Sequence, residues 1–130
     1  MLSDDSLAIE KKKDHYYAIA SYPYHRPYRK LETLGDYVTN YTKEAKLLHA
    51  VYMLERAEAD AEVEIEKLTG IEKFKAFHFT NFIDFDFNKQ SRFIFFSEMA
   101  KKIPMYRVKI PWDIKRLDEV YQKVLANSLP

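Results

Sequence analysis

Hydrophobic and polar residues alternate strictly in the segment FHFTNFIDFDFN, residues 77–88. A period of two is typical of a β-strand with one buried face and one solvated face. The segment NKQS follows as a turn, and RFIFFSE follows as a returning strand, so the pattern predicts a β-hairpin over 74–96. The alternative is an amphipathic helix over 91–103, because SRFIFFSEMAKKI also fits helical spacing.

Apolar residues recur every three or four positions between residues 31 and 69, which indicates a buried helix stripe. One stripe consists of Leu31, Leu34, Val38, Tyr41, Ala45, Leu48 and Tyr52, and a second of Leu47, Val51, Leu54, Ala61, Ile65 and Leu68. We expect one long helix or a helical hairpin that bends near 40–42. Gly70 is suited to the left-handed cap that ends such a helix.

Three shorter elements complete the pattern. An aromatic strand is expected over 14–22, ahead of Pro23. A second alternating strand is expected over 105–110, and a last helix over 114–128 with Asp113 as its cap.

The order β-α-β-β-β-α predicts an α+β fold. We expect a mostly antiparallel sheet of three to four strands, covered on one face by the long helix or helical hairpin and the C-terminal helix. Residues 1–13 are charged and aperiodic, which predicts a flexible N-terminal arm before a single α+β domain over 14–130.

Composition removes several function classes. The chain has 130 residues, a net charge of +1 and no cysteine, which excludes disulfides, thiolate zinc sites and cysteine nucleophiles. Its two glycines cannot form a glycine-rich phosphate loop. No apolar run is long enough to cross a bilayer, and we expect a cytoplasmic protein without a membrane partner. Abundant Glu, Lys, Tyr and Ile follow the thermophile tendency.

The segment YPYHRPYRK, residues 22–30, interleaves aromatic and basic side chains. Aromatic rings stack on bases and guanidinium groups bind phosphates, so the mixture suits single-stranded or structured nucleic acid, or an acidic protein partner. The segment therefore predicts a non-catalytic binding protein. The basic run Lys11–Lys13 and a basic sheet edge are expected to add to the same binding surface. The predicted contact residues are Tyr22, Tyr24, His25, Arg26, Tyr28, Arg29, Lys30, Arg107 and Lys109.

The polar residues on the other face of the predicted Phe-rich strand suggest an alternative function, that of an enzyme. Asp84 and Asp86 would lie about 7 Å apart on one strand face, and His78 would lie further along it. Two carboxylates at that spacing are able to share a divalent metal ion, with His78 as the base of a metal-dependent nuclease or phosphodiesterase. A solvated sheet face with no site shows the same alternation.

Charge asymmetry suggests a third function, in assembly. Residues 31–70 hold four Lys/Arg and nine Asp/Glu, a balance of −5, whereas residues 97–130 hold seven and four, a balance of +3. Opposite patches favour self-association or a charged partner. We expect a homo-oligomer or structural assembly subunit that uses helix 42–69 as its interface. The predicted interface residues are Leu47, Val51, Leu54 and Ile65.

Overall fold

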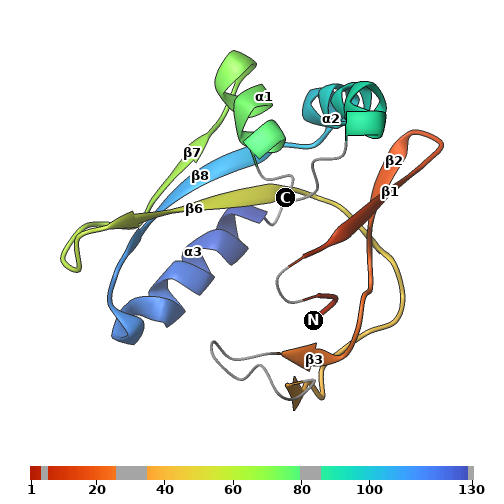
Figure 1. The fold of residues 1–130 in the computed structure, drawn as a ribbon. Helices are drawn as coiled ribbons and strands as arrows, with labels where there is room; N and C mark the ends of the chain where they lie inside the picture. Colours follow the sequence, from red (N-terminus) through yellow and green to blue (C-terminus); the bar gives the residue numbers. More distant parts are fainter. Residues whose placement is uncertain (4–5, 26–34, 80–85, 129–130) are drawn as a thin grey trace. The chain divides into compact units, whose positions relative to one another are not determined.

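A computed structural model describes residues 1–3, 6–25, 35–79 and 86–128 of the chain. It contains strands and helices in an α+β fold, which confirms the predicted fold class (Figure 1). The chain divides into two compact units, Met1–Leu48 and His49–Pro130, and each is described by itself. Whether residues 14–130 behave as a single domain stays a prediction.

Unit 1 is built from short antiparallel strands. Strands β1 (Ala8–Lys12), β2 (His15–Ile19) and β5 (Lys46–Leu47) form one sheet in the order β1-β2-β5, and β3 (Tyr24–His25) pairs with β4 (Asp36–Tyr37). The β1–β2 turn passes through Lys13, whose φ of 54° is left-handed. Alternate residues of β2, Tyr16 and Ala18, are buried. Part of the segment predicted as a flexible arm therefore forms a paired strand.

Unit 2 is built on a mixed sheet with the order β6-β8-β7. Strand β8 (Met105–Pro111) lies in the centre, parallel to β6 (Val51–Ala57) and antiparallel to β7 (Glu64–Lys67). Pro104 and Pro111 bracket the central strand, as the sequence predicted. The prediction of a strand over 105–110 is confirmed.

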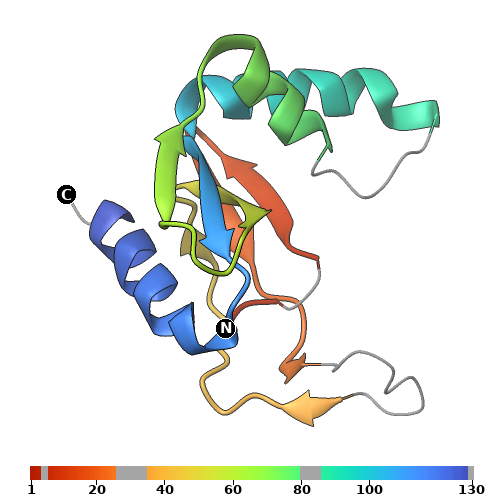
Figure 2. The same ribbon diagram turned by 90° about the vertical axis from the view of Figure 1, so that its left-hand side faces the viewer.

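Helices α1 (Gly70–Phe79) and α2 (Lys89–Lys102) connect β7 to β8, and a short 3-10 helix, η1 (Asp86–Asn88), precedes α2. Both views place α1 and α2 at the end of the sheet where β7 ends and β8 begins (Figures 1 and 2). Side chains buried at this end are Leu68, Ala76, Phe77, Met99, Ile103 and Met105. Burial of these side chains, at about 1.5–3 kcal/mol for each large one, fixes the helices against the sheet end.

Helix α3 (Leu117–Ser128) covers one sheet face, after a 3-10 turn, η2 (Ile114–Arg116). The Asp113 side chain accepts a hydrogen bond of 3.0 Å from the Lys115 amide, which is the cap that the sequence predicted. At the other end of α3, the Tyr52 hydroxyl lies 3.0 Å from Asn127 Oδ1 and 2.8 Å from Ser128 Oγ. The prediction of a helix over 114–128 is therefore confirmed, with its first turn tightened to 3-10 geometry.

The predicted long helix over 31–69 is wrong, and so is the element order that depended on it. The described residues of this stretch form β4, β5, β6 and β7. Helical spacing put Val51 and Leu54 on one side of the chain, but on strand β6 they point to opposite faces. The segment forms a strand because β6 pairs with β8 in a parallel ladder. Val51 and Tyr52 also belong to residue types that favour a half-buried pleated surface.

The predicted Phe-rich hairpin over 74–96 is also wrong. Residues 70–79 and 89–102 are helical, and the expected NKQS turn lies where α2 begins. The alternative helix over 91–103 is correct to within two residues at its start and one at its end. Alternation misled because aromatic side chains occupy more than one side of α2: Phe93 meets the ring of Phe74 on α1 at 5.4 Å, whereas Phe95, two residues further on, meets Phe96 edge-on at 5.7 Å. Residues 80–85 lie outside the described residues.

Gly70 has the left-handed φ of 52° that the sequence suggested, but it begins α1 and does not end a long helix. The strand predicted over 14–22 is confirmed as β2. In the described ranges, the structure has no helix that is long and apolar enough to cross a membrane.

Candidate functional site

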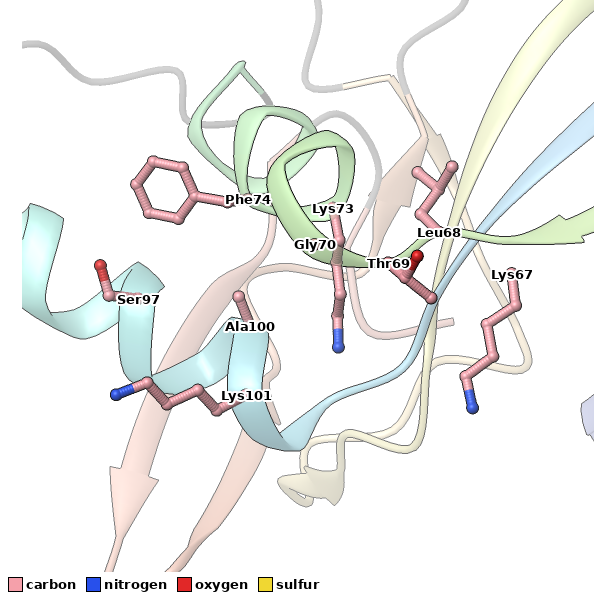
Figure 3. A pocket seen from close by; sticks show the side chains of 9 residues that line it. All are labelled: Lys67, Leu68, Thr69, Gly70, Lys73, Phe74, Ser97, Ala100 and Lys101. Carbon is pink, nitrogen blue, oxygen red and sulfur yellow. The ribbon is translucent and has the colours of Figure 1, made fainter.

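A hollow of about 430 Å³ opens where β7 leads into α1 and the last turn of α2 passes nearby (Figure 3). We call it the lysine pocket, because Lys67, Lys73 and Lys101 supply its charge. Lys67 comes from the end of β7, Lys73 from the first turn of α1 and Lys101 from the last turn of α2. The remaining lining residues are Leu68, Thr69, Gly70, Phe74, Ser97 and Ala100.

The three ammonium groups of the pocket have no carboxylate partner among the residues that the structure describes. Partial burial lowers the pKa of Lys73, and the positive charge of Lys67 lowers it further. Both effects disfavour the protonated form of Lys73. A bound anion would reverse both, because it would replace lost hydration and neutralise the repulsion.

Hydrogen-bonding groups surround these cations. The hydroxyls of Thr69 and Ser97 belong to side chains that line the pocket, and Figure 3 shows Lys73 extending from α1 toward the end of α2. The first amides of α1 have no acceptor within their own helix, and the dipole of the helix adds positive potential at this end. The arrangement is therefore suited to a small oxyanion such as a phosphate group.

An aromatic wall links the lysine pocket to a second hollow of about 490 Å³ on the α1–α2 pair. Phe74 of the lysine pocket stacks on His78 at 6.4 Å and meets Phe93 edge-on at 5.4 Å. Those two partners line the second hollow together with Lys89, Gln90 and Arg92. Lys89 forms an ion pair with Asp86, so its charge is partly compensated. We call the two hollows and this wall the α1–α2 groove.

The predicted binding loop over 22–30 is only partly within the described residues. Tyr22 and Tyr24 have ring centroids 6.5 Å apart, and Tyr24 meets Tyr37 edge-on at 5.8 Å. His25 ends β3 and is exposed. The remaining predicted contacts, Arg26, Tyr28, Arg29 and Lys30, lie outside the described residues. The structure thus gathers tyrosines, including Tyr37, which the contact prediction did not name.

Arg107 and Lys109 do not form a basic sheet edge, because β8 is the central strand of its sheet. Arg107 lies 3.3 Å from Glu55 and 3.2 Å from Glu66, and Lys109 lies 2.8 Å from Glu64. The Glu64 contact raises the pKa of Lys109. Cross-strand neighbours therefore take up the charges that the sequence assigned to a ligand.

The basic run Lys11–Lys13 is divided between β1 and the turn after it. Lys12 pairs with Glu10 at 2.9 Å and lies 5.9 Å from the centre of the Tyr17 ring. These contacts occupy Lys12 within unit 1.

The strand geometry that suggested a nuclease site is absent from the described residues. His78 is in the last turn of α1 and Asp86 is in η1, whereas Asp84 lies outside the described residues. Asp86 forms an ion pair with Lys89. In the described parts of the chain, no group of three or more His, Asp or Glu side chains is placed to hold a metal ion.

The predicted interface residues do not lie on a helix. Leu47 belongs to β5 of unit 1, whereas Val51 and Leu54 belong to β6 and Ile65 to β7 of unit 2. Leu54 and Ile65 flank Val108 in one cross-strand row, and Val51 points to the other face. Of the four, Leu54 and Leu47 are the exposed ones.

Sequence reasoning missed the lysine pocket altogether. Its cations lie at positions 67, 73 and 101, and only the fold brings them together. One local signal was present: Lys67 and Lys73 flank TG at 69–70, a point where a strand or helix had to end. Lys101 carried no such signal.

Comparison with known proteins gave no match: no protein-family model, curated protein sequence or solved structure is significantly similar to this chain.

Proposed function

We propose that the protein is a non-catalytic binding protein that holds single-stranded nucleic acid in the α1–α2 groove. The lysine pocket takes a backbone phosphate, and the exposed aromatic side chains beside it take bases. The observation that carries the proposal is the set of three lysines without carboxylate partners, in the described residues, around one hollow.

A phosphate is expected to bind where positive charge has no carboxylate partner among the described residues. The net charge of the chain is +1, so long-range attraction to nucleic acid is weak and a local cation cluster has to supply the contact. Arg107 and Lys109 are paired with glutamates, whereas Lys67, Lys73 and Lys101 have no carboxylate partner among the described residues. Phosphate is therefore expected at the lysine pocket and not along β8.

An exposed aromatic ring lies beside the lysine pocket and is available to a base. Phe93 is 54% exposed and touches Phe74 of the lysine pocket. Base stacking on a protein ring contributes about 1–3 kcal/mol per base and tolerates any sequence. A cationic hollow beside an exposed ring offers one contact for a phosphate and one for a base. The tyrosine cluster of unit 1, which consists of Tyr22, Tyr24 and Tyr37, is proposed as a second contact.

The test compares two triple variants that remove the same charge. Lys67→Gln, Lys73→Gln and Lys101→Gln together remove the cations of the pocket, whereas Lys43→Gln, Lys75→Gln and Lys115→Gln remove three exposed lysines that line neither hollow. Fluorescence anisotropy with a labelled oligothymidylate gives the dissociation constant at several salt concentrations. We expect the pocket variant to bind about tenfold or more weakly, as for loss of one charge-assisted contact. Its salt slope should fall by about 0.7.

A second pair of variants tests the aromatic half of the groove. Phe93→Ala should weaken oligonucleotide binding about 5- to 100-fold, the range for one lost stacking contact. Phe87→Ala is the control, since Phe87 lies on η1 and is 86% exposed. Equal dissociation constants for the pocket triple and its control, together with no effect of Phe93→Ala, would rule out the proposal.

A further inference from the structure

Helix α3 carries an exposed row of large apolar side chains. The exposed fractions are 81% for Ile114, 58% for Leu117, 60% for Tyr121 and 39% for Leu125. Steps of three and four residues place them along one side of η2 and α3. With Leu54 of β6, which is 61% exposed, we call them the α3 patch.

The α3 patch lies toward the β6 side of the sheet. Tyr52 bonds the end of α3, and Leu54 points to the same sheet face as Tyr52. The other side of α3 is engaged elsewhere: Arg116 donates to the Ala59 and Ala61 carbonyls, and Lys123 donates to the Val63 carbonyl. Figures 1 and 2 show the helix along one face of this sheet.

Strand β6 is at an edge of its sheet in the part of the chain that the structure describes, because its ladder runs to β8 alone. An edge strand presents backbone donors and acceptors that pair readily with another strand. The open edge and the α3 patch therefore occur on the same side of unit 2, and one partner is able to cover both.

We propose that this side of unit 2 binds a second copy of the chain across a twofold axis. Two β6 strands would pair edge to edge, and the two α3 patches would cover each other. This assembly goes beyond the proposed nucleic-acid binding and uses none of the residues of the α1–α2 groove.

The size of the face fits a dimer. The five side chains of the α3 patch expose on the order of 500 Å² of apolar surface, taking roughly 100 Å² for each. A specific interface buries about 800 Å² per partner, and the β6 edge with the exposed Trp112 supplies more area. A single exposed side chain would be ordinary, but a continuous row beside an open edge is not.

The apolar character of the α3 patch favours a second copy of the chain as its partner. The five side chains of the patch carry no charge, and Arg116 of η2 pairs with Glu119 of α3 at 2.8 Å. The exposed Asp118 borders the row, so the row offers mainly apolar contact and little charge that would select a partner of opposite sign. A twofold interface instead needs a surface that complements itself, as an apolar helix row beside a strand edge does.

Light scattering on the full chain over a range of concentrations tests the proposal. We expect twice the chain mass for the parent, and a dimer dissociation constant at least tenfold higher for Leu117→Glu. Tyr121→Lys is a second disrupting variant in case Leu117→Glu does not fold, which circular dichroism reports. The control is Ile71→Glu on α1, because Ile71 is 65% exposed outside the patch and should leave the dimer intact.

Hydrogen exchange supplies an independent readout. The amides of β6 should exchange slowly in the parent and faster in Leu117→Glu, while the amides of β8 keep their protection. A parent that is monomeric at every concentration, or a dimer that both patch variants leave unchanged, would overturn the proposal.

Discussion

Lys73, which we propose as a ligand contact, carries a charge that no described carboxylate compensates. Its side chain is partly buried, and its pKa is lowered by desolvation and by Lys67. Lys109, by contrast, has Glu64 as a counter-ion. The charge on Lys73 therefore opposes folding slightly, which is the usual situation of a group that is satisfied only when its ligand is bound.

Lys73→Met should raise the melting temperature at pH 7 by about 1–3 °C, because it removes a charge that the fold disfavours. The folded pKa lies below the unfolded value, so the cost is full below the folded pKa, decreases as pH rises past it, and vanishes above the unfolded value. The gain should accordingly shrink at alkaline pH. Thermal unfolding followed by circular dichroism at both pH values measures it.

The control for this pH dependence is Lys115→Met, since Lys115 is exposed on η2. It should give no comparable stabilisation at either pH. A Lys73→Met protein that is less stable than the parent at pH 7 would show that the ammonium group is satisfied within the fold.

At the scale of elements, the sequence predicted those whose ends carry clear chemical signals. Pro104 and Pro111 bracket β8, and Asp113 caps the last helical segment, so both elements could be identified from sequence. The segments over 31–69 and 74–96 lacked such ends, apart from Gly70, which did not distinguish the end of a strand from the end of a helix. There the choice between strand and helix depended on pairing with β8 and on packing between α1 and α2, and neither is encoded in local periodicity.

The candidate site could not be predicted from the sequence for the same reason. The cross-strand partners of Arg107 and Lys109 come from β6 and β7, which sequence reasoning placed in a helix. Without those strands, the two cations looked available to a ligand. The three lysines of the pocket likewise become neighbours only through the β7–α1 and α2–β8 connections.

Strand β8 provides a prediction at this scale. Arg107→Gln with Lys109→Gln should leave oligonucleotide affinity within about twofold of the parent, because glutamates already neutralise both cations. The same change should lower stability by roughly 0.5–2 kcal/mol, since Glu55, Glu64 and Glu66 would then repel one another across the sheet. Anisotropy and urea unfolding measure the two effects separately. A large loss of affinity in a folded variant would instead support the predicted role of Arg107 and Lys109 in nucleic-acid binding.

At the scale of the whole molecule, the division into two units changes how function is distributed. The α1–α2 groove and the α3 patch both belong to unit 2, whereas the tyrosine cluster belongs to unit 1. A dimer formed through the α3 patch would carry two grooves, and linked sites raise the apparent affinity for a strand long enough to reach both. Assembly and binding would then reinforce each other without sharing residues.

The isolated segment 49–130 should fold and retain the groove. It contains its own three-stranded sheet, helices α1, α2 and α3, and most of the fully buried side chains of the described residues, including Phe77, Met99 and Val108. We expect a cooperative thermal transition and oligonucleotide affinity within about fivefold of the full chain. The loss of affinity should come from the tyrosine cluster alone, so Tyr22→Ala with Tyr24→Ala in the full chain should reproduce it. A segment that shows no cooperative transition would instead support the single domain over 14–130, because its core would then require residues of unit 1.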